Sequence, residues 1–260
     1  MIGIESDAGV TCAMAVMAKA SNPGRVKTRM VPPLTAIEAS DLNTAFLVDI
    51  SHNMKAAQQL AAISPWMAFA PAGSAQFFET NLPSGIGLLE TVGPNLGECL
   101  LKAASSLLDR GYQSACLINS DSPTLPAGYL VAAANLLAAD GDRIVLGPST
   151  DGGYYLIGMT QRHRRLFEDI DWSTERVFGQ TLVRASEIGV PVVVLPTWYD
   201  VDDAGTVCML IGELFEGQPF RVVGAQTTPA DSSRALLARL LRETDLARRI
   251  GLGEPSARVA

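Results

Sequence analysis

The strongest constraint on the fold is a short apolar run that stops abruptly in polar residues. Residues 115–118 are typical of a buried strand, and Pro123, five residues beyond, prevents the strand from continuing. The next apolar segment, residues 129–137, has helical spacing. Asp121 therefore lies where a strand is followed by a helix, which is the place where open α/β sheets bind ligands. Its carboxylate either helps to hold a divalent metal ion, or caps the helix or stabilises a turn.

Strands and helices alternate along most of the chain. Apolar runs of strand length occur at residues 12–17, 66–70, 143–147 and 191–195, and helical spacing at residues 35–50, 96–110 and 174–188. Between residues 71 and 94 we expect irregular structure with a short strand near 88–89. Such alternation predicts a three-layer, Rossmann-like α/β fold with a mostly parallel sheet and helices on both faces. We expect one domain at residues 1–217 and a C-terminal appendage at 218–260, with an amphipathic helix over 232–250.

Composition argues against several classes of protein. The balance of 20 Lys+Arg against 27 Asp+Glu gives a net charge of −7, which disfavours a nucleic-acid binder. Four widely spaced cysteines and two histidines provide no zinc-ligand pattern. No run approaches the roughly 18 apolar residues of a membrane span, and the N-terminus is acidic where a signal peptide is basic. We expect a cytoplasmic protein without a membrane span; the sequence does not indicate its oligomeric state.

A basic loop follows the first predicted strand. Lys19 is followed by a Pro-Gly turn at Gly24 and then by three cations within five residues, Arg25, Lys27 and Arg29. Glycine lets the backbone approach an anion, and Lys and Arg neutralise it. The pattern predicts a phosphate-binding loop that uses Lys19, Gly24, Lys27 and Arg29, with a solvated basic loop as the alternative.

A turn-forming sequence, Pro-Ser-Thr-Asp-Gly-Gly, follows the strand at 143–147. It is consistent with a simple hairpin. However, Thr150 and Asp151 also offer a hydroxyl and a carboxylate beside the flexible backbone of Gly152 and Gly153. We predict that this turn contacts a ligand.

Ser173 and Thr174 precede a predicted helix that runs to about residue 188. Either hydroxyl would serve as an N-cap, and capping alone explains both residues. The free N–H groups of a helix start also bind anions, so a ligand-binding role is the alternative.

Three carboxylates follow the strand at 191–195 within four residues: Asp200, Asp202 and Asp203. Like charges this close destabilise a fold unless a cation or hydrogen bonds offset them. A D-x-D cluster after a strand indicates a metal site, and helix capping accounts for one or two of the three.

Four of these polar segments each follow a predicted strand: the basic loop, Asp121, the turn at 150–153 and the carboxylates at 200–203. The carboxyl ends of parallel strands meet at one edge of a sheet, so the segments are expected to converge. A metal–diphosphate site requires Lys or Arg side chains at one place and carboxylates at others. The side-chain cations and the metal that the carboxylates hold both offset the phosphate charge.

Several motifs also occur together in a characteristic order. They are residues 18–29, 95–98, 120–123, 146–156, 172–174 and 200–202. Over about residues 12–215, the chain resembles a bacterial family of glycosyltransferases of the GT-A, nucleotide-diphospho-sugar transferase fold, often described as associated with radical-SAM proteins. More distantly, it is similar to the guanylyltransferases that load phosphoenolpyruvate or phospholactate and to the molybdenum-cofactor guanylyltransferase. The resemblance implies that Lys27 and Arg29 hold the nucleotide phosphates, and that Asp121 and Asp202 bind Mg²⁺ or Mn²⁺.

The sequence thus favours a metal-dependent glycosyltransferase that transfers the sugar of a nucleotide-diphospho-sugar to a small-molecule acceptor and releases a nucleoside diphosphate. Asp121 and Asp151 are the predicted catalytic carboxylates, Asp151 as general base for the acceptor hydroxyl or as a plain turn residue. The predicted acceptor-binding residues are Thr150, Gly152, Gly153, Ser173 and Thr174. A nucleotidyltransferase that releases pyrophosphate and a non-catalytic nucleotide-binding domain are the alternatives.

Overall fold

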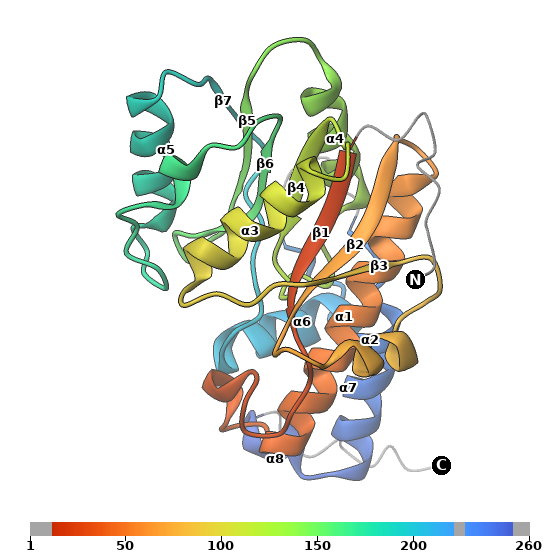
Figure 1. The fold of residues 1–260 in the computed structure, drawn as a ribbon. Helices are drawn as coiled ribbons and strands as arrows, with labels where there is room; N and C mark the ends of the chain where they lie inside the picture. The colour runs from red at the N-terminus through yellow and green to blue at the C-terminus, as the bar shows by residue number, and fades with distance from the viewer. Residues whose placement is uncertain (1–11, 221–226, 252–260) are drawn as a thin grey trace.

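A computed structural model describes residues 12–220 and 227–251. The strands are β1 (Cys12–Lys19), β2 (Ile63–Ala70), β3 (Gly87–Glu90), β4 (Ser114–Ile118), β5 (Ile144–Pro148), β6 (Tyr154–Met159) and β7 (Val192–Val194). The helices are α1 (Ala36–Gln58), α2 (Ala75–Asn81), α3 (Leu96–Leu108), α4 (Ala127–Ala138), α5 (Val177–Glu187), α6 (Ala204–Glu216), α7 (Asp231–Glu243) and α8 (Leu246–Arg249), with short 3-10 helices η1 (Thr28–Met30) and η2 (Arg164–Phe167) (Figure 1). In the described segments, none of the helices has both the length and the apolarity needed to cross a membrane.

The strands form one sheet in the order β3-β2-β1-β4-β6-β5-β7. β6 runs antiparallel to β4 and β5, while the other neighbouring strands are parallel. Because β6 returns from β5 as a hairpin, β1, β4, β5 and β7 all end at the same edge. The prediction of a mostly parallel α/β sheet is confirmed, and this edge is where the polar segments emerge.

Helices cover both faces of the sheet. Successive residues of β1 point to opposite faces: Met14 and Val16 join a buried cluster with α1, α4, α6 and α7, whereas Ala13 and Ala15 join a second cluster with α3 and α5. Figure 1 shows these helices on the two sides of the central strands. The sheet is therefore the middle of three layers, as expected from its almost continuously apolar strands.

Two helix starts follow from local sequence. Thr35 accepts from the Glu38 N–H at 3.2 Å and the Glu38 carboxylate accepts from the Thr35 N–H, so the predicted capping box opens α1. Asn95 accepts from the Glu98 N–H at 2.9 Å and caps α3. Both caps satisfy backbone donors that a first helical turn leaves free.

Three local predictions need correction. The segment expected to be irregular contains α2, because Phe78 is fully buried against Phe69, with ring centroids 5.0 Å apart. The strand at 191–195 is only a three-residue strand at the sheet edge, where Val194 is 51% exposed. Helix α5 begins at Val177, so neither Ser173 nor Thr174 is its N-cap.

The C-terminal segment packs against α1. The helix expected over residues 232–250 is present as α7 and α8, and Leu237 and Leu240 are buried in the same cluster as α1. Asp49 of α1 accepts from the N–H groups of Ser232 and Ser233, both at 2.8 Å, and from the Ser233 hydroxyl at 2.6 Å. The division of the chain at residue 217 stays a prediction, and its outer ends, residues 1–11 and 252–260, lie outside the described residues.

Replacing Asp49 tests how strongly this contact ties α7 to the domain. Asp49 is only 3% exposed, and Asp49→Ala would leave three donors at the start of α7 without their acceptor. We expect a loss of about 2 kcal/mol in the free energy of unfolding, measured by chemical denaturation. Asp41→Ala, at an exposed position of the same helix, should change it by less than about 0.5 kcal/mol. Equal effects from the two variants would contradict this role of Asp49.

Candidate functional site

A cavity of about 860 Å³ lies at the carboxyl edge of the sheet. Among the predicted site residues, those that line it are Lys19, Lys27, Arg29, Asp121, Asp151, Gly153, Ser173, Thr174 and Asp202. They come from the end of β1 and the loop after it, the segment after β4, the β5–β6 turn, the segment before α5 and the segment before α6. Gly24, Thr150 and Gly152 are not part of this lining.

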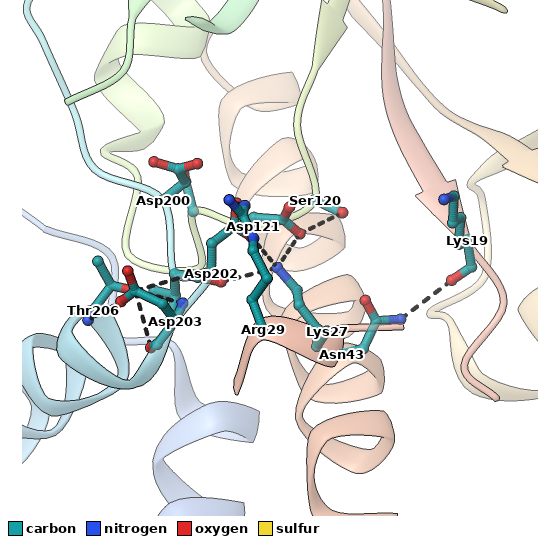
Figure 2. Close-up of polar contacts among 12 residues, drawn as sticks. Lys19, Lys27, Arg29, Asn43, Ser120, Asp121, Asp200, Asp202, Asp203 and Thr206 are labelled. Atoms are coloured by element: carbon teal, nitrogen blue, oxygen red, sulfur yellow. Dashed lines mark hydrogen bonds and ion pairs between the residues drawn. The ribbon is translucent and has the colours of Figure 1, made fainter. Parts of the chain in front are cut away.

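The Lys27 ammonium lies at the centre of the polar contacts. Its Nζ is 2.6 Å from Asp121 Oδ1 and 3.1 Å from Asp202 Oδ1, and it donates to the Val201 carbonyl at 2.9 Å (Figure 2). An ammonium has three donors, and each has an acceptor here. The Lys27 side chain is 6% exposed, against 26% for Asp121 and 24% for Asp202. One cation thus pairs with two partly buried carboxylates, and Arg29 supplies a second positive charge at Asp202.

The local backbone directs Lys27 into the site. The Arg25 N–H donates to the Asn22 carbonyl at 2.9 Å, closing a turn in which Gly24 has a φ of +75°. Lys27 itself has a left-handed backbone, with φ 50° and ψ 37°, and its carbonyl accepts from the Met30 N–H at 3.0 Å to start η1. A non-glycine residue in this region is strained and persists only where its surroundings hold it. Gly24 therefore shapes the loop rather than the cavity wall.

Helix α1 fixes the start of the same loop. Asn43 donates from Nδ2 to the Lys19 carbonyl at 3.2 Å and to Ser21 Oγ at 2.9 Å. The side chains of Lys19 and Arg25 line the cavity, and within the described residues neither has an ion-pair partner. No phosphate-binding role was predicted for Arg25 from the sequence, although its position in the basic loop indicated that it could bind phosphate. These two cations are available to an anionic ligand.

Backbone contacts hold Asp121 and Asp202 on either side of Lys27. The Val201 N–H donates to the Asp121 carbonyl at 2.8 Å, and Ser122 Oγ donates to the Tyr199 carbonyl at 2.9 Å. Ser120 Oγ donates to Asp121 Oδ1 at 2.7 Å and orients that carboxylate. The segments after β4 and before α6 are thus joined directly behind the ion pairs.

The three aspartates of the 200–203 cluster have different partners. Asp202 pairs with Lys27 and Arg29, and Asp203 caps α6 by accepting from the Thr206 N–H at 2.8 Å (Figure 2). Asp200 accepts from the Ser149 hydroxyl at 2.6 Å. Their mutual repulsion is therefore offset in three separate ways, one of them the predicted helix cap.

The surroundings shift the acidities of two of these groups in opposite directions. Burial raises the pKa of Asp202, but the charges of Lys27 and Arg29 outweigh it and hold that pKa below its usual value. Burial raises the pKa of Asp200 to about 6, and the nearby carboxylates of Asp151, Asp202 and Asp121 add to the rise. Asp202 is thus held in its charged form, while Asp200 titrates near neutral pH.

The β5–β6 turn forms another wall of the cavity. Asp151 Oδ1 accepts from the Gly153 N–H at 2.8 Å, which is a turn-stabilising contact. Gly152 has a φ of +89°, and a Cβ there would lie 2.2 Å from the Glu175 carbonyl oxygen. Only glycine permits this close approach, which brings the segment carrying Ser173 and Thr174 against the turn. Thr150, by contrast, is exposed and outside the cavity lining.

Trp172 is a lining residue that the sequence did not assign. A Cβ on Gly97 of α3 would lie 2.9 Å from its Nε1, so this glycine lets the indole pack on the start of the helix. Trp172 and Leu96 add apolar surface to a largely polar cavity. Both residues lie in motifs that carried the family resemblance, and that resemblance was the sequence signal from which their place in the cavity could have been found.

The donor set suits a divalent cation that a substrate helps to bind. Within residues 12–220 and 227–251, no three acidic, cysteine or histidine side chains are arranged to hold a metal by themselves. Asp121 and Asp202 nevertheless converge on one positive charge, the Lys27 ammonium. Mg²⁺ typically takes one or two carboxylates and completes its coordination with phosphate and water oxygens. The two aspartates fit that pattern.

The raised pKa of Asp200 predicts how the free energy of unfolding depends on pH. Asp200 binds a proton more tightly in the folded protein than in the unfolded chain, so its contribution to stability is present at low pH and is lost as pH rises. The loss falls between the ordinary aspartate value of about 4 and the folded value of about 6, and amounts to on the order of 2–3 kcal/mol. Asp200→Asn should remove this part of the pH dependence of the free energy of unfolding. Asp140→Asn, at an exposed site, should retain it, and parallel wild-type and Asp200→Asn curves would contradict the assignment.

Solved structures of other proteins resemble this chain to different degrees. A protein from Desulfovibrio desulfuricans G20, described as a candidate nucleotide-diphospho-sugar transferase, is 24% identical, with 92% of this chain and 97% of that chain covered at a TM-score of 0.75. A cytidylyltransferase from Leptospira borgpetersenii is 11% identical, with coverage of 89% and 94% and a TM-score of 0.48. The inositol-1-phosphate CTP transferase from T. maritima is 15% identical, with coverage of 82% and 99% and a TM-score of 0.44. The first likeness establishes the fold, and the other two are too loose to bear on function.

Sequence comparisons add one family model. No curated protein matches the sequence significantly. The family model described as "Uncharacterized protein conserved in bacteria (DUF2064)" matches residues 53–174, just under half of the chain. That segment contains Asp121 and Asp151 but neither Lys27 nor Asp202. The chain is therefore similar to this family over the middle of its sequence, from the end of α1 to the segment before α5, and its fold is that of the nucleotide-diphospho-sugar transferase-like structures.

Proposed function

We propose that the protein is a metal-dependent transferase that uses a nucleotide-diphospho-sugar donor. The observation that carries the proposal is the combination of charges in one cavity. Two carboxylates there share a single point of positive charge, and two further cations have no acidic partner among the described residues. A diphosphate with a divalent metal is complementary to this arrangement. The Desulfovibrio structure and the motif resemblance support the same class of donor.

In this proposal Asp121 and Asp202 hold Mg²⁺ or Mn²⁺ with oxygens of the donor diphosphate. When bound, the metal supplies positive charge that stabilises the leaving diphosphate. Lys19 and Arg25 bind phosphate oxygens, and Lys27 and Arg29 contribute further positive charge at the metal end of the cavity. Their combined role is to neutralise the charge that develops as the sugar–phosphate bond breaks.

The acceptor binds beside the β5–β6 turn. Gly153, Ser173 and Thr174 provide backbone and hydroxyl groups in the cavity lining. Asp151 uses Oδ1 in the turn, while its Oδ2 accepts no hydrogen bond from the described residues. That oxygen is placed to take the proton of an acceptor hydroxyl as a general base.

Nucleotidyl transfer is the second candidate, and a specific observation favours it. Strand β4 is followed by Asn119-Ser120-Asp121, a single carboxylate rather than a D-x-D pair. The unpaired cations Lys19 and Arg25 also provide charge for a third phosphate. In that reaction the bond between the α- and β-phosphates breaks and pyrophosphate leaves.

Ligand-dependent thermal unfolding tests the proposal. The purified protein is heated with UDP- or GDP-sugars and with nucleoside triphosphates, each with and without Mg²⁺ or Mn²⁺. A ligand at 100 times its dissociation constant stabilises by about 2.7 kcal/mol, and we expect metal-dependent stabilisation by a sugar nucleotide. Stabilisation by a triphosphate alone would favour nucleotidyl transfer. If no nucleotide stabilises the protein under any condition, the proposal is wrong.

A variant connects the stabilisation to the site. Asp121→Asn keeps the shape of the side chain but removes its charge, so the metal-dependent part of the stabilisation should disappear. Asp109→Asn, at an exposed position outside the cavity, should retain it. Phosphorus NMR of a reaction with the stabilising nucleotide then identifies the leaving group. A nucleoside diphosphate indicates glycosyl transfer, pyrophosphate indicates nucleotidyl transfer, and a bound nucleotide that stays unchanged with every acceptor tried would favour a non-catalytic domain.

A further inference from the structure

Lys27 fills the position between two carboxylates that the proposed metal also needs. We propose that Lys27 is an exchangeable internal counter-ion: its ammonium pairs with both Asp121 and Asp202 in the free protein, and it moves to a nucleotide phosphate when metal and nucleotide bind together. The exchange rests on the proposed function, because it requires a metal–nucleotide ligand. It adds a binding order, in which the divalent metal enters with the nucleotide rather than before it.

The first reason is competition for the same atoms. The ammonium contacts Asp121 Oδ1 at 2.6 Å and Asp202 Oδ1 at 3.1 Å. A divalent ion bound by both carboxylates on that side would use the same two oxygens, and two cations cannot share so small a space. Binding of the metal therefore requires that Lys27 withdraw.

The second reason is the charge balance of the free protein. Asp121 and Asp202 have side chains only 26% and 24% exposed, and carboxylates this close to each other repel. Lys27 offsets that repulsion without any ligand. A metal arriving alone would have to displace this buried cation from both carboxylates and leave it with the Val201 carbonyl as its remaining acceptor and no negative partner, which is costly.

The third reason is that the neighbouring contacts permit the movement. Arg29 pairs with the other oxygen of the same carboxylate, Asp202 Oδ2, so that contact can persist while Lys27 leaves. Lys27 lines the same cavity as Arg25 and Lys19. A four-carbon side chain can therefore move toward a phosphate in this cavity while its backbone remains in place.

Exchange of this kind couples the two ligands. A phosphate that accepts the displaced ammonium removes the penalty for metal binding, so the nucleotide raises the affinity for the metal. Linkage requires the metal to raise the affinity for the nucleotide by the same factor.

Binding of Mn²⁺ without nucleotide tests the exchange directly. Free Mn²⁺ is measured by electron paramagnetic resonance in titrations of the wild type, Lys27→Met and Lys19→Met. We expect Lys27→Met to bind Mn²⁺ at least tenfold more tightly than the wild type. Lys19→Met removes the same charge from the same cavity but touches neither carboxylate, so its affinity should stay within about twofold. Equal affinities in all three proteins, or equal gains in both variants, would overturn the proposal.

Folding of the variant is followed in the same samples. Loss of Lys27 leaves the carboxylates facing each other, so Lys27→Met should be less stable than the wild type and should recover stability in Mn²⁺ but not in the same concentration of Na⁺.

If Lys27→Met does not fold in either Mn²⁺ or Na⁺, the exchange is tested instead by acylating the lysines of the wild-type protein. A concentration of Mn²⁺ that fills the site should speed the labelling of Lys27 while leaving that of Lys102, outside this cavity, unchanged. Unchanged labelling of Lys27 would overturn the exchange. None of these measurements uses a nucleotide, so they can fail while nucleotide binding succeeds, and the reverse.

Discussion

The ion pairs of Lys27 with Asp121 and Asp202 are the contacts on which the rest of the site depends. They join the loop after β1, the segment after β4 and the segment before α6, and Lys27 and Asp202 are 175 residues apart in the chain. The backbone contact between Val201 and Asp121, at 2.8 Å, supports the same junction. A change at any of these three segments would therefore alter the shape of the cavity as well as its charge.

The distribution of charge explains how an acidic protein can present a phosphate site. The net charge of −7 is spread over the whole chain, whereas the cavity gathers Lys19, Arg25, Lys27 and Arg29 from one short segment. Two of these cations are paired with carboxylates and two are not. The paired set suits a place where metal and phosphate meet, and the unpaired set suits phosphate alone. Local arrangement thus matters more than the total charge.

Much of the fold could be predicted because it follows from periodicity. The apolar strands, the capping box at Thr35 and the convergence of strand ends all depend on residues that are close in sequence. Helix α2 could not be predicted, nor could the short length and exposed edge position of the strand predicted at 191–195, because burial of Phe78 and exposure of Val194 depend on distant neighbours. Some features of the site could likewise be predicted from local sequence, and others depend on distant neighbours. Strand ends placed Asp121 and the basic loop at one edge, but nothing local shows that Lys27 turns inward or that Gly97 admits Trp172.

A crystal structure of the protein with Mn²⁺ and a nucleoside diphosphate would test the central claim most directly. Anomalous scattering locates Mn²⁺ without ambiguity, and the same map shows the Lys27 side chain. We predict an anomalous peak between Asp121 and Asp202, with the Lys27 ammonium within hydrogen-bond distance of a phosphate oxygen. A peak away from both carboxylates, or a Lys27 ammonium still bound between them beside the nucleotide, would contradict a shared metal–nucleotide site at this edge of the sheet.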